Sequence, residues 1–197
     1  MTPILIDQNH DARAEAEALI AQVYAHEYGA KIDAFADLLI ALPGPDGKLC
    51  AAAGLRVGGN FFSEVYLDRS IEDTLSDYWR PPATRGEIAE VTTLAATHPN
   101  ASHALFSGIV GYLKSQQVRF AFFTVTERLH QMLKRVGIPA EQLAEAKADR
   151  VTNPDDWGIY YATNPKVVAI HDAFVSMPAT AVSDSVAPAE IEGAHVA

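Results

Sequence analysis

The sequence predicts a mixed α/β sheet with helices on both faces. Strand-like and helix-like segments follow one another in the order strand, helix, hairpin, helix, strand, helix, strand, helix and strands. Arg119–Val125 is almost continuously apolar, which is typical of a central strand that is covered on both faces. The 197 residues suffice for one domain and are too few for two. We therefore expect one domain over residues 1–172 and a disordered tail over residues 173–197, which is rich in Ala, Val, Pro, Ser and Glu.

The N-terminal part of the chain predicts a helix between an edge strand and a hairpin. Pro3–Asp7 is a short apolar run that suits the edge strand. Asn9 is placed to cap a helix whose apolar residues follow the helical period, and Gly29 is a natural end for it. Phe35–Leu42 and Leu49–Val57 flank a turn rich in Pro and Gly, which indicates an antiparallel hairpin.

Shorter patterns predict the remaining peripheral elements. Phe61–Leu67 alternates weakly and suits a short strand, and Ser70–Trp79 begins with a capping pattern that predicts a helix. Nearer the C-terminus, Glu127–Arg135 predicts a further helix. Gln142–Ala146 and Trp157–Ala162 are candidate closing strands.

The central stretch of the chain, Glu87–Thr126, reads as a strand, a polar loop that opens a helix, and a second strand. Alternate residues of the first strand are expected to share a face, with Ile88, Glu90, Thr92 and Leu94 on one side and Ala89, Val91, Thr93 and Ala95 on the other. The helix after Pro99 and Asn100 presents unpaired N–H groups and the positive end of its dipole. This arrangement predicts an anion site, typically for phosphate.

Composition and charge exclude several classes of function. A formal net charge of −10 disfavours a nucleic-acid-binding surface, which needs clustered Lys and Arg. Cys50 is the only cysteine, so no internal disulfide is possible. The histidines are scattered without metal-ligand spacing, so no metal is expected. The N-terminus lacks the features of a secretory signal, and no segment has the apolar length of a membrane span, so we expect a cytoplasmic protein without membrane contact.

Several short strings, taken together and in order, resemble the thermostable hemolysin family, whose members are similar in fold to the Gcn5-related N-acetyltransferases and the acyl-homoserine-lactone synthases. The match covers roughly residues 23–169, and the ordered set is more specific than any single string. The strings are Tyr28-Gly29-Ala30 with Ile32 and Phe35, Ala53-Gly54-Leu55-Arg56, Glu64 with Tyr66-Leu67, Glu72, Glu90-Val91, Leu94-Ala95, Phe122-Phe123-Thr124, Gly137, Trp157-Gly158, Tyr160-Tyr161 and Asn164-Pro165.

The resemblance implies an acyl-CoA N-acyltransferase-like fold in which two parallel strands splay apart around a thioester. It also implies that backbone amides between the central strand and its helix grip the pyrophosphate of the donor. In this sequence the corresponding residues are Leu94, Ala95, Ala96, Asn100, Ala101, Ser102 and His103. The loop between the central strand and its helix lacks the glycines and the leading basic residue of the usual acetyltransferase pattern. The donor could therefore be a longer acyl-CoA or an acyl-carrier protein.

Acyl transfer from a thioester needs a deprotonated nucleophile, a donor for the developing oxyanion and an exit for the thiolate. Glu90 is the predicted base, directly or through a water, because an acid in an interior strand is costly unless it is used or paired. The alternative is a structural ion pair of Glu90 with Arg56 or Arg85. The oxyanion donor would be a backbone N–H group near Thr93–Ala95.

Other side chains are candidates for binding the acceptor and for protonating the leaving group. The predicted substrate-binding residues are Arg56, Glu64, Glu72 and Thr92. The arginine would bind a substrate carboxylate through two hydrogen bonds. The alternative is that it lies at the edge of the sheet with its guanidinium exposed to solvent. The two glutamates would hold an amine, or else belong to a solvated face. Thr126 or Tyr160 would protonate the thiolate, although both residue types are more often structural.

These residues lead to an expected function with two alternatives. The first is an N-acyltransferase that moves an acyl group from an acyl-CoA or acyl-carrier-protein thioester to a small amine such as an amino acid. The alternative is a non-catalytic, hemolysin-like effector on the same fold that binds an acyl lipid or a membrane surface. A third reading is lactone synthesis from S-adenosylmethionine, which the N-terminal helix disfavours because it lacks the Arg- and Trp-rich pattern of such synthases.

Overall fold

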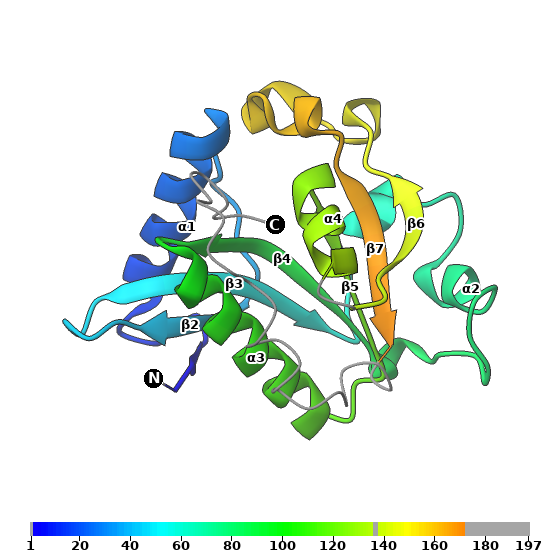
Figure 1. Cartoon of the computed structure of the whole chain (residues 1–197), viewed down its shortest axis with the longest axis horizontal. Helices are drawn as coiled ribbons and strands as arrows, with labels where there is room; N and C mark the ends of the chain where they lie inside the picture. Colours follow the sequence, from blue (N-terminus) through cyan, green and yellow to red (C-terminus); the bar gives the residue numbers. More distant parts are fainter. Residues whose placement is uncertain (1, 136–137, 172–197) are drawn as a thin grey trace.

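The computed structural model describes residues 2–135 and 138–171 of the chain. In this part of the chain seven strands form one sheet (Figure 1). β4 and β5 run parallel, and every other neighbouring pair is antiparallel. In their order across the sheet, the strands are β1 (Ile4–Ile6), β2 (Leu38–Pro43), β3 (Leu49–Val57), β4 (Ile88–Ala96), β5 (Phe120–Val125), β7 (Lys166–His171) and β6 (Glu141–Glu145).

The described residues also form four α-helices and five short 3₁₀ helices. The α-helices are α1 (Arg13–Tyr28), α2 (Ile71–Leu75), α3 (Pro99–Ser115) and α4 (Glu127–Arg135). The 3₁₀ helices are η1 (Ser63–Tyr66), η2 (Arg85–Glu87), η3 (Ala148–Arg150), η4 (Pro154–Trp157) and η5 (Tyr160–Thr163).

Helices cover both faces of the sheet. On one face, α3 packs against β2, β3 and β4 through residues such as Leu105 and Ile109, and α4 packs against β5 and β7 through Leu133. On the other face, α1 packs through Ile20, while α2 and η1 pack against β5 and β7. Along β2 and β5 the buried side chains alternate between the two faces of the sheet, and Leu39 of β2 packs towards α1.

β4 and β5 separate in the middle of the sheet. Their parallel ladder runs from Ile88 opposite Phe120 to Val91 opposite Phe123, and it ends there within the described residues. The part of β4 that begins at Thr92 therefore faces a split instead of a neighbouring strand on that side. This is the splayed pair of parallel strands that the family resemblance implies.

A β-bulge bends β4 at the split. Thr93 has a φ of 45°, and the pairing with β3 shifts there, since Gly54 lies opposite Thr92 and Ala52 lies opposite Ala95. The bulge also changes which residues share a face. Beyond Thr93, Leu94 packs on the α3 side and Ala95 on the α1 side, so the strict alternation predicted for this strand is wrong after residue 92.

Two predicted strands are absent from the described residues. Phe61–Leu67 contains η1, because the N–H groups of Phe62 and Ser63 donate to the side chain of Glu90 and not to a strand. Trp157–Ala162 contains the end of η4 and the start of η5. The second closing strand is Lys166–His171, whose four central residues are all buried and show no alternation that would reveal it.

The predicted helices are confirmed, with shifted ends. Gly29 ends α1 in the left-handed conformation with a φ of 66°, but the helix begins at Arg13 after Ala12, and Asn9 does not cap it. The Ser70 side chain accepts from the N–H of Asp73, yet α2 is shorter than predicted. The hairpin is confirmed, although its first strand begins at Leu38. The predicted tail lies outside the described residues.

Candidate active site

A pocket of about 290 Å³ lies at the split between β4 and β5. Thr92 and Thr93 of β4, Thr124 of β5, Arg56 of β3 and Ser63 of η1 contribute polar groups to its lining. The rest of the lining consists of Tyr24, residues 31–34, Ala36, Phe62, Tyr66, Val91, residues 151–153, Asp156, Trp157 and Tyr160. Residues from distant parts of the sequence therefore surround the position where the sheet opens.

Two hydroxyl groups beside the split form a hydrogen bond between η1 and β5. The side-chain oxygens of Ser63 and Thr124 lie 3.1 Å apart and share a hydrogen bond that joins η1 to β5. Ser63 is buried, with 2% of its surface exposed. The hydroxyl pair thus fixes η1 over the open end of the β4–β5 ladder.

Glu90 is fully buried on β4, and both of its carboxylate oxygens are engaged. Oε2 accepts a hydrogen bond from Arg56 Nη1 at 3.1 Å and one from the Phe62 N–H at 2.8 Å. Oε1 accepts from the Ser63 N–H at 2.6 Å. Glu90 is not among the described residues that line the pocket. This geometry favours the ion pair with Arg56, and the role of catalytic base stays a prediction.

Arg56 connects Glu90 to the pocket. Its side chain is 29% exposed and lines the pocket, while Nη1 bonds to the buried carboxylate. A guanidinium carries five N–H donors, so this bond leaves donors for a ligand carboxylate. The structure thus brings together Arg56 and Thr92 of the predicted substrate-binding residues.

Aromatic side chains form much of the remaining wall. The rings of Phe62 and Trp157 stack with centroids 5.8 Å apart, and those of Tyr24 and Tyr160 lie 6.4 Å apart. Burial raises the pKa of Tyr24 and of Tyr160 well above the usual value of tyrosine. Because a free thiol has a pKa of about 8.5, a tyrosine with a raised pKa is a poor proton donor to a thiolate. The acid role of Tyr160 stays a prediction.

A second, smaller cavity lies on the opposite side of the sheet, between α3 and the strands. It has a volume of about 40 Å³, and its lining is apolar apart from Lys114 and Arg119. The apolar lining consists of Val91, Phe106, Ile109, Val110, Leu113, Val118, Ala121, Phe123 and Ile170. We call this cavity the α3 groove. Val91 lines both cavities, so they reach the end of the β4–β5 ladder from the two faces of the sheet.

The predicted donor-binding residues lie at the end of β4 and in the first turn of α3. Ala95, Ala96 and Ala101 are fully buried in the apolar core. His98 caps the helix, since its Nδ1 accepts from the N–H of Ala101 at 3.2 Å. The side-chain oxygen of Ser102 is buried without a hydrogen-bond partner among the described residues. The helix start therefore lies where the sequence places it, and its function as an anion site stays a prediction.

Three other predicted residues lie apart from the pocket. Glu64 and Glu72 both pair with Arg85, at 2.6 Å and 3.0 Å, and the Glu64 carboxylate also accepts from the N–H of Ile71. These bonds join η1, α2 and η2, which gives both glutamates a structural role. The hydroxyl of Thr126 accepts from the N–H of Leu129 and caps α4. None of the three lines the pocket in the part of the chain that the structure describes.

Several pocket residues were not predicted from the sequence. The contact between Ser63 and Thr124 gave no signal because it joins residues 61 positions apart, although Thr124 belongs to a family string. Tyr66 was interpreted only as part of a family string and Tyr24 was not singled out, although both residues line the pocket. Aromatic residues clustered around Trp157 would have been the best available indication.

Two features, a cluster of metal ligands and a membrane-spanning helix, are absent from the described residues. Within residues 2–135 and 138–171, no group of three or more His, Cys, Asp or Glu side chains is placed to hold a metal ion. None of the helices in the same ranges has the length and apolar character needed to cross a membrane.

The chain is similar to one protein family and to several solved structures. A family model described as thermostable hemolysin matches residues 6–174. TofI in an apo form is 15% identical with a TM-score of 0.59, covering 92% of this chain and 99% of that one. The acyl-homoserine-lactone synthase LasI is 13% identical with a TM-score of 0.56, covering 86% of this chain and 89% of that one.

FeeM, an N-acyl amino acid synthase from uncultured soil microbes, is 15% identical with a TM-score of 0.56, covering 86% of this chain and 95% of that one. No curated protein matches the chain. At these identities the structures show a shared fold. The predicted fold class, a mixed acyltransferase-like sheet with helices on both faces, is therefore confirmed.

Proposed function

Since this chain belongs to the thermostable hemolysin family, we propose that it transfers an acyl group from a thioester to a small amine that carries a carboxylate. The observation that carries this proposal is the pair of cavities at the end of the β4–β5 ladder, both lined by Val91. One is polar and aromatic, and the other is apolar. A thioester at the split would have its acyl tail on one side and the attacking amine on the other.

The proposed donor is a thioester of a fatty acid, carried by coenzyme A or by an acyl-carrier protein. The apolar α3 groove favours an acyl tail longer than acetyl, because each buried methylene lowers the free energy of binding by about 0.8 kcal/mol. The first turn of α3 would bind the phosphate of the donor through backbone N–H groups such as that of Asn100. LasI and FeeM, which share the fold, are described as synthases of acylated products.

The proposed acceptor is an amine such as an amino acid. Arg56 would bind its carboxylate, and Thr92 would contact the same molecule, since both residues line the pocket. Glu90 would act as a positioning residue, because it holds Arg56 and the N–H groups of Phe62 and Ser63. The amine would lose its proton to solvent at alkaline pH.

The proposed reaction has two steps that balance. The amine nitrogen attacks the thioester carbonyl, and N–H groups of β4 near Thr93 stabilise the oxyanion, because that edge of the strand has no β5 partner among the described residues. The nitrogen then loses a proton to solvent as the C–S bond breaks, the amide remains on the acceptor, and the thiolate takes up a proton from solvent. The products are an N-acyl amine and a free thiol.

The proposal is tested by incubating the purified protein with octanoyl-CoA and a mixture of amino acids. We expect the release of free thiol to depend on both substrates. Hydrolysis alone would release thiol without the amine. An absence of thiol release with coenzyme A and carrier-protein donors alike would refute the proposal.

The second candidate function is binding of an acyl lipid without turnover. The observation that favours it is the imidazole of His98, which already occupies the N–H of Ala101 at the helix start. This candidate predicts that octanoyl-CoA or fatty-acid vesicles bind while no thiol is released. Thiol release that depends on the amine would exclude it.

A further inference from the structure

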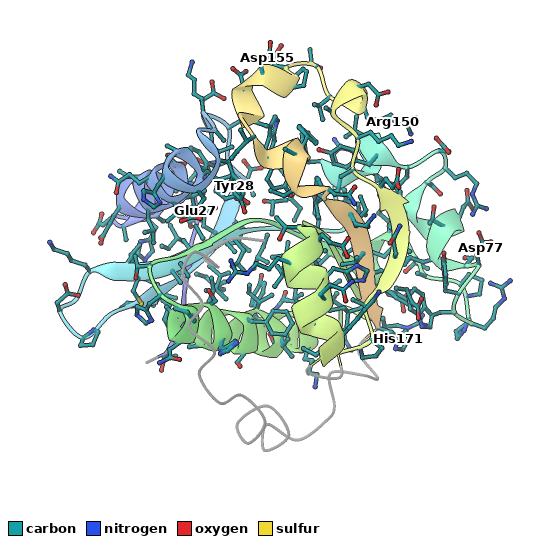
Figure 2. All side chains as sticks on the ribbon, turned by 45° about the horizontal axis from the view of Figure 1, so that its top comes forward. Glu27, Tyr28, Asp77, Arg150, Asp155 and His171 are labelled. Carbon is teal, nitrogen blue, oxygen red and sulfur yellow. The ribbon has the colours of Figure 1, made fainter. Side chains whose placement is uncertain are left out.

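Residues 147–163 form a connection between β6 and β7 that we call the strap. It contains η3, η4 and η5, and six of its residues line the polar pocket. In Figure 1 the strap is the yellow and gold segment at the top of the molecule. Figure 2 labels Arg150 and Asp155 on it, with Tyr28 at the end of α1 nearby. The strap is therefore a wall of the pocket contributed by a part of the chain far from α1 in sequence.

One end of the strap meets α1 through a backbone contact that requires glycine. Gly158 has a φ of 53° and a ψ of −125°, a conformation that side chains disfavour. A Cβ at this position would lie 2.1 Å from the carbonyl oxygen of Tyr28. The same oxygen accepts from the Ile159 N–H at 2.8 Å, and the N–H of Lys31 donates to the Asp156 carbonyl at 2.6 Å.

The other end of the strap is held by Arg150. Its Nε donates to the carbonyl oxygen of Val65 at 3.0 Å, and its Nη2 donates to the carbonyl oxygen of Leu67 at 2.6 Å. The guanidinium also pairs with Asp68 at 2.9 Å. The strap is thus attached both to α1 and to the end of η1, which are the two elements on either side of the pocket.

The attachments decide how far apart the walls of the pocket lie. Trp157, next to Gly158, stacks on Phe62 of the segment that leads into η1. On the α1 side, Tyr24 and Lys31 line the same pocket. A change in the contact between the strap and α1 therefore changes the space between these side chains.

We infer that Gly158 is a specificity-determining residue for the acceptor, because it allows the strap to lie against α1 and so sets the width of the polar pocket. This inference rests on the proposed function and adds to it. The donor lies on the other face of the sheet in that proposal. The strap therefore acts on the acceptor alone.

The test is a pair of variants at the two ends of the strap, Gly158→Ala and Arg150→Ala. An alanine Cβ would lie about 0.9 Å closer to Tyr28 O than the 3.0 Å that real Cβ atoms keep, so the strap and α1 must move apart. Displacements of about 1 Å lower catalytic efficiency by up to ~100-fold. We expect kcat/KM for the best amino-acid acceptor to fall ~10- to 100-fold through KM, with bulkier amines gaining relative to small ones.

The KM for octanoyl-CoA should stay unchanged in both variants. A general loss of stability would lower the active fraction, and hence kcat, without changing either KM. The matched controls are Gly111→Ala, where no atom lies within 4 Å of a new Cβ, and Arg69→Ala, which removes an exposed ion pair with Asp77. Both controls should keep the acceptor KM of the parent.

A second measurement does not depend on turnover. In a Trp79→Phe background, Trp157 is the only tryptophan, so the quenching of its fluorescence by acrylamide reports how closely the strap packs against the rest of the protein. We expect stronger quenching in Gly158→Ala and Arg150→Ala than in the controls. If Gly158→Ala does not fold, Arg150→Ala decides both measurements.

Two results would overturn the inference while leaving the proposed function intact. One is unchanged quenching, and the other is stronger quenching with an unchanged acceptor KM and unchanged acceptor preference. A parent protein that releases no thiol with any donor and amine would instead refute the proposed function, and the specificity role of Gly158 with it.

Discussion

Replacing Glu90 distinguishes a positioning residue from a catalytic base. Glu90 is fully buried and accepts three hydrogen bonds, from Arg56 and from the N–H groups of Phe62 and Ser63. In Glu90→Ala all three donors lose their acceptor. In Glu90→Gln the side chain keeps its size and one carbonyl oxygen, but its NH₂ group faces a donor.

The expected magnitudes follow from these contacts. Removing one partner of a buried ion pair costs about 3–5 kcal/mol, and Arg56 is 29% exposed, so the lower end of ~3 kcal/mol applies to Glu90→Ala. At ~2–4 °C per kcal/mol for a chain of this size, the Tm should fall by ~6–12 °C. For Glu90→Gln, one retained acceptor leaves a loss of ~1–2 kcal/mol.

The assay combines thermal unfolding, followed by circular dichroism, with steady-state thiol release. We expect both variants to lower the Tm and to raise the acceptor KM, because Arg56 and η1 lose hydrogen bonds to Glu90. We expect the pH–rate profile of Glu90→Gln to keep the shape of the parent profile. Glu141→Gln, at an exposed position on β6, is the matched control. The reasoning is refuted if Glu90→Gln unfolds at the parent Tm, keeps the parent KM and loses more than ~1,000-fold in kcat, which would identify Glu90 as the base.

Two further predictions concern the α3 groove and the acid stability of the protein. With unbranched acyl-CoA donors, kcat/KM should rise by about four-fold per added methylene until the α3 groove is filled. Ala121→Leu, which fills the groove from β5, should remove this rise, whereas Gly111→Leu on the exposed face of α3 should keep it. An equal kcat/KM for acetyl-CoA and octanoyl-CoA would contradict the assignment of the groove to the acyl tail. The pKa of Glu87 is lowered from 4.5 to about 2, first by the hydrogen bond from the Thr84 N–H and then by those from the Thr84 hydroxyl and Arg119. A carboxyl group with a lowered pKa in the folded state stabilises the fold above about pH 4.5 and loses this effect as the pH falls towards 2. Glu87→Gln should therefore lower the Tm at pH 7 and approach the parent Tm near pH 2, and a Tm difference that is the same at both pH values would disprove the assignment.

Local patterns were sufficient to predict much of the fold. The hairpin, the helix that Gly29 ends, and the continuous apolar run of β5 all depend on residues close together in the chain. Strand β7 has four buried central residues and no alternation, so periodicity alone could not separate it from a loop or a buried helix segment. The η1 segment was misread because its N–H groups bond to Glu90, 27 and 28 positions away.

The candidate site was predicted only where neighbouring strands of the sheet carry it. Glu90, Arg56 and Thr92 lie on adjacent strands of the central sheet, and their nearness follows from the strand order. Glu64 and Glu72 were assigned to the acceptor because the sequence does not reveal that Arg85 pairs with both. The β-bulge at Thr93 also had no signal, because a threonine with a positive φ is rare and local propensity argues against it.

The most direct test of the proposed acyl transfer is product analysis by mass spectrometry, coupled to a count of free thiol. The protein is incubated with octanoyl-CoA, or an octanoyl carrier protein, and the twenty common amino acids. The account predicts one N-octanoyl amino acid, or a narrow set, in an amount equal to the thiol released. Free octanoic acid in place of the amide, or no thiol from either donor, would contradict it.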